Sequence, residues 1–167
     1  HAIGVQDAAW RNLQALLPET TGLVVCVGLP LLHRNGLFNC AALIADGRIL
    51  GIYAKHFLAG DGIHYEPRWF KPWPRGVRAT YERDGVSYAL GDINFNVSGV
   101  RIGFEICEDA WVANRPGADL APGRVAGPFA HAGHRLESQG DEGARRGRGG
   151  FRCGGAGLRH AAAHQGR

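Results

Sequence analysis

Apolar residues recur at three- and four-residue steps near the start of the chain, a pattern typical of an amphipathic helix over residues 3–17. Polar residues stand between them, as expected for the face that contacts water. Pro18 predicts the end of this helix, and residues 19–22 predict a turn. The apolar positions that share the helical spacing are Val5, Ala9, Leu13, Leu16 and Leu17.

Continuous apolar runs follow the turn, and they predict strands. Residues 23–30 contain several β-branched side chains without polar alternation, which is typical of a strand buried on both faces. Residues 37–45 and 48–55 are two further apolar runs, separated by Asp46-Gly47. Because an Asp-Gly pair between apolar runs is a strong signal for a tight turn, these two runs predict a β-hairpin.

A long loop and a second pair of strands are expected further along the chain. Residues 56–80 combine Gly and Pro with several aromatic side chains, which predicts a loop anchored by aromatic rings. Residues 92–97 and 100–107, joined by Ser98-Gly99, predict the second β pair. One helix followed by mostly buried strands predicts an α/β layered domain over about residues 1–120.

The composition changes abruptly after about residue 120. Residues 121–167 hold 12 Gly and 8 Arg but only three aliphatic residues larger than Ala. Such a segment cannot bury enough apolar surface to offset its chain entropy, so we expect a disordered, low-complexity tail. Two origins stay open: a natural tail similar to arginine–glycine segments that bind RNA, or a frameshifted or mis-joined coding end. The abrupt loss of Val, Ile and Leu favours the frameshift.

The formal net charge of +4 belongs to that tail. Residues 1–120 carry 11 basic and 12 acidic side chains, a net charge of about −1, whereas residues 121–167 carry a net charge of about +5. A nearly neutral body excludes an electrostatic footprint for nucleic acid on the expected folded part. No apolar run is long enough for a membrane-spanning helix, and the N-terminus lacks the features of a secretory signal.

The cysteines favour a reducing, cytoplasmic location. Four of them, at positions 26, 40, 107 and 153, lack the paired spacing of a zinc site, and they are too few for a disulfide framework in a chain of 167 residues. We expect Cys26 and Cys40 to be small buried apolar residues. The chain contains no Met, even at position 1, so we expect it to be a piece of a longer protein.

Three side chains carry candidate chemistry, each with an ordinary structural alternative. Cys107 ends a predicted buried strand, where a nucleophile would stand on a sharp turn and the backbone amide of Glu108 would face a developing oxyanion. The alternative is an inert buried cysteine. Lys55 ends another predicted strand, either as a desolvated ammonium near a nucleophile or as a solvated edge residue. Glu66, in the aromatic loop, is either a functional group or a surface carboxylate.

Five motifs in one order carry a resemblance that the single residues do not. The motifs are Gly28-Leu29-Pro30, Phe38-Asn39-Cys40-Ala41, GIYAKHFL at residues 51–58, YEPRWF at residues 65–70 and GFEICEDAW at residues 103–111. Together they resemble the nitrilase (carbon–nitrogen hydrolase) superfamily, whose catalytic set is Glu, Lys and Cys. The last motif, followed by Arg115-Pro116-Gly117, is most similar to the glutaminase domains of glutamine-dependent NAD synthetases. The resemblance covers about residues 1–120.

The resemblance implies a fold, a reaction and a role for each candidate. The implied fold is an incomplete α-β-β-α sandwich. Cys107 would be the nucleophile, Lys55 would stabilise the tetrahedral oxyanion, and Glu66 would be the second glutamate, which holds the lysine. The thiolate would attack the carboxamide of glutamine or of another small amide, ammonia would leave for NAD synthesis from deamido-NAD, and water would hydrolyse the thioester. This domain would need no metal and no other cofactor.

The chain departs from the family pattern at both ends. The general-base Glu of the family belongs to a segment ahead of the helix over residues 3–17, and Glu19 does not replace it because no motif surrounds it. The later strands of the family's sheet give way to the Gly/Arg tail. The synthetase domain, with its ATP and Mg²⁺, is missing as well. We therefore expect a catalytically incomplete piece of an enzyme whose parent is a homo-oligomer.

Two other functions stay open. A stand-alone amidase of the same superfamily would use the same chemistry, although the Cys-Glu-Asp-x-Trp motif argues against it. A non-catalytic product whose basic tail binds nucleic acid is supported only by residues 121–167.

Overall fold

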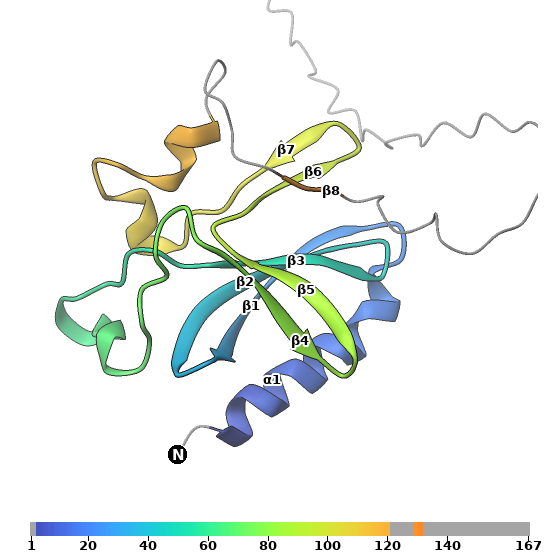
Figure 1. Cartoon of the computed structure of the whole chain (residues 1–167), viewed down its shortest axis with the longest axis horizontal. Coiled ribbons are helices and arrows are strands. Elements are labelled where there is room, and N and C mark those ends of the chain that lie inside the picture. The colour runs from blue at the N-terminus through green and yellow to red at the C-terminus, as the bar shows by residue number, and fades with distance from the viewer. Residues whose placement is uncertain (1–2, 121–128, 132–167) are drawn as a thin grey trace, which may run out of the picture. The chain divides into compact units, whose positions relative to one another are not determined.

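The computed structural model describes residues 3–120 and 129–131. Within this part, one α-helix precedes eight strands, and short 3₁₀ helices connect several of them (Figure 1). The regular elements are α1 (Ile3–Leu16), β1 (Val24–His33), β2 (Gly36–Ala45), β3 (Arg48–Ala54), β4 (Arg78–Arg83), β5 (Val86–Gly91), β6 (Asn94–Val97), β7 (Val100–Ile102) and β8 (Phe129–His131). The 3₁₀ helices are Leu17–Thr20, Gly62–His64, Glu66–Arg68, Cys107–Ala110 and Pro116–Leu120. The chain is thus a mixed α/β domain, as its sequence predicts.

Five strands form one sheet in the order β1-β2-β3-β5-β4. Neighbouring strands run antiparallel except β3 and β5, which pair in parallel at Ile52 with Leu90 and at Tyr53 with Gly91. A smaller sheet has the order β7-β6-β8, in which β6 and β8 run parallel. The parallel pair within the larger sheet places the end of β3, and therefore the residues that follow it, beside the end of β5.

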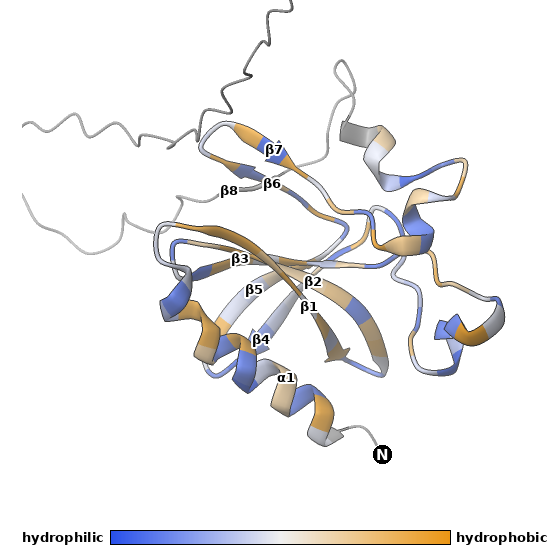
Figure 2. Cartoon of the chain, turned by 180° about the vertical axis from the view of Figure 1, so that it is seen from behind, coloured by the Kyte–Doolittle hydropathy of each residue, from blue (hydrophilic) through white to orange (hydrophobic). Residues whose placement is uncertain are grey.

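Alternate residues of the central strands pack into two different apolar clusters. In β2, Ala42 and Ile44 face the cluster that contains Trp10 and Leu13 of α1, whereas Leu43 faces the other cluster. Successive side chains of a strand point to opposite faces, so both faces of this sheet are covered. In Figure 2, α1 shows apolar and polar patches side by side, as an amphipathic helix does.

Several sequence predictions are confirmed. The helix predicted over residues 3–17 is α1, and the hairpin predicted around Asp46-Gly47 is formed by β2 and β3, which pair antiparallel from Ala45 and Arg48. Asp46 and Gly47 both have positive φ, at 50° and 74°. That backbone conformation is the one that two-residue hairpin turns favour, and it explains why the Asp-Gly pair is an informative signal.

The second hairpin of the large sheet corrects the sequence prediction, which places no strand there. Residues 78–91 form β4 and β5 around Asp84-Gly85, with φ values of 53° and 76°. The sequence prediction instead extends the long loop over residues 56–80 and places no strand between that loop and residue 92. The turn signal is the same as in the first hairpin. Residues 78–83 alternate polar and apolar side chains, which is a strand signal, but they lack the continuous apolar run on which the prediction relied.

Three predictions about strands and their burial are wrong. β1 lies at an edge of the sheet, and its side chains alternate between exposed and partly or fully buried, with Val24 52% exposed. Its continuous apolar sequence therefore does not mark burial on both faces. Cys26 on this strand is exposed, although Cys40 on β2 is fully buried as expected. The predicted strand over residues 100–107 ends at Ile102, and β7 is exposed or only partly buried.

The predicted tail lies almost wholly outside the described residues. Residues 129–131 are the exception, and they form β8 through backbone pairing with β6, so the expectation of no regular structure is wrong for these three residues. Backbone hydrogen bonds of this kind do not require the apolar periodicity that the segment lacks. In the described part of the chain, no helix is both long enough and apolar enough to cross a membrane.

Candidate active site

Lys55 is a fully buried lysine that directly follows β3. Its side chain is 1% exposed, and its ammonium lies 2.5 Å from Oε2 of Glu66. Its backbone amide donates to the carbonyl of Asn39 at 2.9 Å, which continues the pairing of β3 with β2 by one residue. A lysine is almost never fully buried without a partner, because the lost hydration of the ammonium must be replaced. The interpretation of Lys55 as a solvated edge residue is therefore wrong.

Glu66 receives three hydrogen bonds that hold it against the lysine. Besides the Lys55 ammonium, the side-chain amide of Asn39 donates to Oε1 at 2.9 Å, and the backbone amide of Ala59 donates to Oε2 at 2.7 Å. Partial burial alone would raise the pKa of Glu66, but the bonds from Lys55, Ala59 and Asn39 outweigh it and lower that pKa. Glu66 is thus a fixed anion, and its interpretation as an ordinary surface carboxylate is wrong.

Cys107 is exposed and has a strained backbone. It begins the 3₁₀ helix Cys107–Ala110, five residues after the end of β7, so the prediction that it ends a buried strand is wrong. Its φ is 50°, in the left-handed region that residues other than glycine seldom adopt. Such strain costs about 1–3 kcal/mol and concentrates at functional sites. The sharp turn expected at Cys107 is present, and it comes from this conformation rather than from a strand end.

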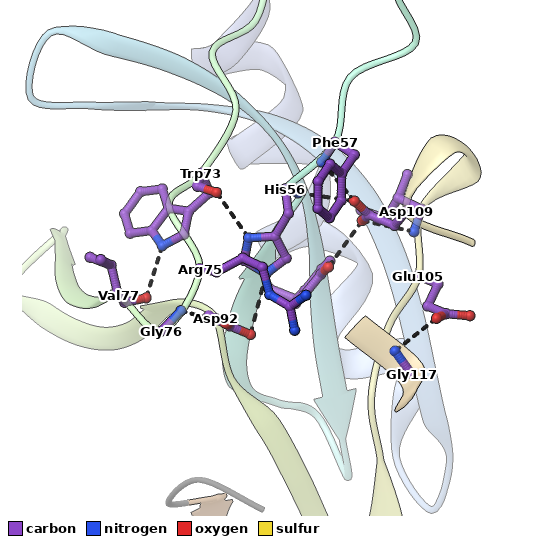
Figure 3. Close-up of polar contacts among 12 residues, drawn as sticks. His56, Phe57, Trp73, Arg75, Gly76, Val77, Asp92, Glu105, Asp109 and Gly117 are labelled. Carbon is purple, nitrogen blue, oxygen red and sulfur yellow. Dashed lines mark hydrogen bonds and ion pairs between the residues drawn. The ribbon is translucent and has the colours of Figure 1, made fainter. Parts of the chain in front are cut away.

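Contacts on either side of Cys107 close its segment into a loop. The amide of Gly117 donates to Oε1 of Glu105 at 2.7 Å (Figure 3). The guanidinium of Arg115 lies 3.6 Å from the same oxygen. A Cβ atom at position 117 would lie 2.5 Å from that oxygen, so a larger residue would require the Glu105 carboxylate to shift. The 3₁₀ helix that carries Cys107 is therefore held at both ends.

Asp109 is a buried carboxylate at the centre of these segments, which the sequence reasoning named only as a motif letter. It is fully buried, and its carboxylate accepts four hydrogen bonds. Oδ1 accepts from the amides of His56 at 3.1 Å and Phe57 at 2.8 Å, and Oδ2 accepts from the amide of Ile106 at 3.1 Å and the hydroxyl of Tyr53 at 2.9 Å. Burial first, and then the charge of Asp109, raise the pKa of Tyr53. The motif holds three acidic residues, Glu105, Glu108 and Asp109, so the sequence alone gives no signal that singles out the buried one.

His56, the next residue in the sequence after Lys55, pairs with a second carboxylate. Its Nδ1 donates to the carbonyl of Trp73 at 2.9 Å, and its Nε2 lies 3.2 Å from Oδ1 of Asp92 (Figure 3). Burial lowers the pKa of His56, but the bonds to Asp92 and to the Trp73 carbonyl outweigh it, so the net shift is upward. Burial likewise acts to raise the pKa of Asp92, yet the bonds from His56 and from the amide of Gly76 lower it.

An open pocket of about 650 Å³ lies where these segments meet. Residues that follow Lys55, such as Phe57 and Leu58, line it together with Phe70 and with Glu108 and Val112 from the segment that follows Cys107. Its volume suits a small molecule, and apolar walls with a few charged groups are typical of such sites. The structure therefore brings Lys55 and Glu66 into contact and places the segments after Lys55 and after Cys107 on one pocket. In the described part of the chain, no three His, Cys, Asp or Glu side chains are grouped as metal ligands would be.

The comparisons with known proteins place enzymes among the relatives of this chain. These enzymes are glutamine-dependent NAD(+) synthetases, and the resemblance drawn from the motifs is confirmed. The bovine protein of that name is 33% identical over 130 aligned residues, which span 68% of this chain and 18% of the bovine protein. The Saccharomyces cerevisiae protein is 36% identical over 110 residues, which span 59% of this chain and 15% of the yeast protein.

A solved structure agrees with the sequence relatives. The crystal structure of a glutamine-dependent NAD(+) synthetase from Cytophaga hutchinsonii matches with a TM-score of 0.62 and 40% identity, over 64% of this chain and 18% of that protein. No family model matches the chain. The chain is therefore related to glutamine-dependent NAD(+) synthetases, and it spans less than a fifth of the length of these relatives.

Proposed function

We propose that this chain carries part of the ammonia-releasing site of a glutamine-dependent NAD synthetase. In this proposal Cys107 is the nucleophile, Lys55 stabilises the oxyanion and Glu66 holds the lysine. The backbone amide of Glu108 is a second donor to the oxyanion. The observation that carries the proposal is the buried Lys55 ammonium, bound to the anionic Glu66, in a chain whose relatives are named for their use of glutamine.

The proposed reaction proceeds through a thioester. The Cys107 thiolate attacks the side-chain amide carbon of glutamine, so that a C–S bond forms and the carbonyl oxygen becomes an oxyanion. The C–N bond then breaks, and the departing NH₂ group takes up the proton that the thiol had lost, so that it leaves as ammonia. Water attacks the thioester next, which releases glutamate and regenerates the thiol. The Lys55 charge would favour both the thiolate and the oxyanion, since both are anions that form during the reaction.

The missing parts of the reaction belong to other segments in this proposal. In this proposal the general base is a Glu in a segment ahead of α1, and residues 1–167 alone do not turn over glutamine. ATP and Mg²⁺ would act at a synthetase domain elsewhere in the parent enzyme, which would be a cytoplasmic homo-oligomer. The five-stranded sheet and α1 would form one half of an α-β-β-α sandwich.

The test is a Cys107→Ala variant of the full-length enzyme that joins this domain to a synthetase domain. We expect glutamine-dependent NAD formation to be lost and ammonia-dependent NAD formation to be retained, because the variant would remove only the ammonia-releasing site. Cys26→Ala is a matched control, since Cys26 is the other exposed cysteine in the described part of the chain. Retained use of glutamine by the Cys107→Ala variant would exclude Cys107 as the nucleophile.

Measuring ammonia release together with NAD formation separates the proposal from a stand-alone amidase. An amidase would release ammonia from its substrate without any coupling to NAD formation. Residues 1–167 alone, assayed for glutamate release, are expected to show no measurable turnover. Turnover at a rate typical of enzymes would show that the residues present here are sufficient.

A further inference from the structure

The Asp109 carboxylate connects two segments that are far apart in the sequence. Oδ1 accepts the two backbone amides that come directly after Lys55, those of His56 and Phe57. Oδ2 accepts the backbone amide that comes directly before Cys107, that of Ile106. One fully buried side chain therefore bridges the backbone next to the lysine and the backbone next to the cysteine.

We propose that Asp109 is a positioning residue that sets where the Cys107 sulfur stands relative to the Lys55 ammonium. The inference rests on the proposed function, in which these two groups act together. Asp109 touches neither the substrate nor the reacting atoms in this proposal. It acts through the backbone on either side of them.

The number and geometry of the bonds suit this role. A carboxylate oxygen that accepts two amides is fixed in two directions, and all four donors lie within 3.1 Å. Hydrogen bonds to a charged acceptor are stronger than those between neutral groups. Cys107 needs such support, because its positive φ is unfavourable for a residue with a side chain. The carboxylate thus offsets the strain of the turn that it also orients.

The hydroxyl of Tyr53 gives the bridge a third anchor. Tyr53 lies on β3, is 1% exposed and donates to Oδ2 at 2.9 Å. Its ring packs 5.9 Å from that of Phe104, measured between centroids, and Phe104 precedes Cys107 by three residues. The bridge is therefore rooted in the central strands of the sheet, and small displacements of the Cys107 segment would have to move Asp109 as well.

The experiment uses the full-length enzyme and an Asp109→Asn variant. Asparagine has one acceptor oxygen, so if that oxygen keeps the amides of His56 and Phe57, its NH₂ group faces the amide of Ile106, donor against donor. If the side chain flips, the conflict moves to the other two amides. In either orientation the two segments lose their common acceptor, while the size and shape of the side chain are preserved.

Two readouts report on position rather than on folding. The first is the rate of Cys107 alkylation by iodoacetamide as a function of pH, followed by mass spectrometry. The second is kcat and KM for glutamine. For Asp109→Asn we expect the alkylation midpoint to move up by about one pH unit, which corresponds to a tenfold smaller thiolate fraction. We also expect kcat to fall at least tenfold, with little change in KM.

Matched variants make the result decisive. Asp92→Asn removes another carboxylate that binds next to β3 but has no bond to the Cys107 segment, so it should leave the alkylation profile unchanged. Tyr53→Phe removes one of the four bonds to Asp109 and should shift the midpoint in the same direction by less. If Asp109→Asn does not fold, as judged by circular dichroism, the Tyr53→Phe profile decides.

Two outcomes overturn the inference in distinguishable ways. A folded Asp109→Asn or Tyr53→Phe variant with the wild-type profile excludes Asp109 as a positioning residue. The proposed function then stands if Lys55→Gln still raises the midpoint. A Lys55→Gln variant with the wild-type profile excludes the pairing of thiol and lysine, and with it both the proposed function and the inference.

Discussion

Two neighbouring residues at the end of β3 each pair with a carboxylate, and the two pairs differ in strength and in kind. Lys55 and Glu66 lie 2.5 Å apart, and the glutamate has two further donors. His56 and Asp92 lie 3.2 Å apart, and Asp92 also accepts a hydrogen bond from the amide of Gly76. Both cationic side chains are 1% exposed, so burial of the cation does not explain the difference.

The two pairs also differ in how they respond to a change of pH. Histidine is the only side chain whose ordinary pKa lies between pH 5 and 8, so the His56 pair can lose its charge under ordinary conditions. In the proposed function the Lys55 charge stabilises the oxyanion, whereas the charge of His56 sets the strength of its contact with Asp92 as the pH changes.

The largest expected effect comes from removing the Lys55 ammonium. In the full-length enzyme, Lys55→Ala should lower the glutamine-dependent turnover by ~10²–10³-fold, the magnitude typical of losing one oxyanion donor. Ammonia-dependent NAD formation should remain, because the synthetase site is not altered. Steady-state kinetics with each nitrogen source measures both effects.

The matched change in the second pair sharpens the comparison. Asp92→Asn should lower the same turnover by less than tenfold, since neither Asp92 nor its bonds reach the Cys107 segment. Equal losses in the two variants would mean that Lys55 acts through the local structure rather than through its charge.

A smaller effect is expected from neutralising the partner of the lysine. Glu66→Gln keeps the shape of the side chain but leaves the buried Lys55 ammonium without an anion, which should lower the free energy of unfolding by about 2 kcal/mol at pH 7. Urea denaturation followed by tryptophan fluorescence measures it.

The pH dependence of this loss provides an independent check. Because the pKa of Glu66 is lowered in the folded state, its stabilisation is present above the ordinary value of 4.5 and disappears as the pH falls through the lowered pKa. The difference between wild type and Glu66→Gln should therefore be largest near neutral pH and should shrink under acid conditions. A difference that is constant down to pH 3 would contradict the ionic role of Glu66.

The comparison also shows what the sequence could and could not predict. Lys55 is recognisable because it follows an apolar run, and its motif indicates a role. His56 stands next to it in the same motif and is not singled out by any pattern, because its partners Trp73 and Asp92 lie 17 and 36 residues away and only the parallel pairing of β3 with β5 brings Asp92 close. Local patterns do not report such long-range pairing.

The same reasoning accounts for the errors in the strands. The Asp46-Gly47 turn is recognisable because apolar runs flank it, whereas Asp84-Gly85 lies in a hairpin whose outer strand, β4, alternates exposed and partly or fully buried positions at the sheet edge. The predicted strand before Cys107 ends early because the segment is fixed by Asp109 and Glu105 rather than by a ladder. The catalytic assignments of Cys107, Lys55, Glu66 and Glu108 stay predictions.

The smallest expected effect is the change in stability caused by Asp92→Asn, and it depends on the pH. Because the Trp73 carbonyl can only accept, Nδ1 of His56 must carry a proton, and Nε2 carries one only in the charged ring. In neutral His56 the bare Nε2 therefore faces the Asp92 carboxylate, acceptor against acceptor. In the Asp92→Asn variant, the side-chain amide could instead donate its NH₂ to that nitrogen and accept the Gly76 amide with its oxygen.

The expected result is therefore a loss of stability at low pH and no loss at high pH. Because the pKa of His56 is raised in the folded state, its pairing stabilises the fold below the ordinary value of 6.5, and this stabilisation is lost as the pH rises through the raised pKa. Because the pKa of Asp92 is lowered, its contribution is present above the ordinary value of 3.8 and is lost as the pH falls through the lowered pKa. Asp92→Asn should lower the free energy of unfolding by about 1 kcal/mol near pH 5 and leave it equal or higher near pH 9. Urea denaturation at both values measures this, with Glu66→Gln as the variant that should show no such crossing. An equal loss at pH 5 and pH 9 would mean that His56 does not change its charge in the folded protein.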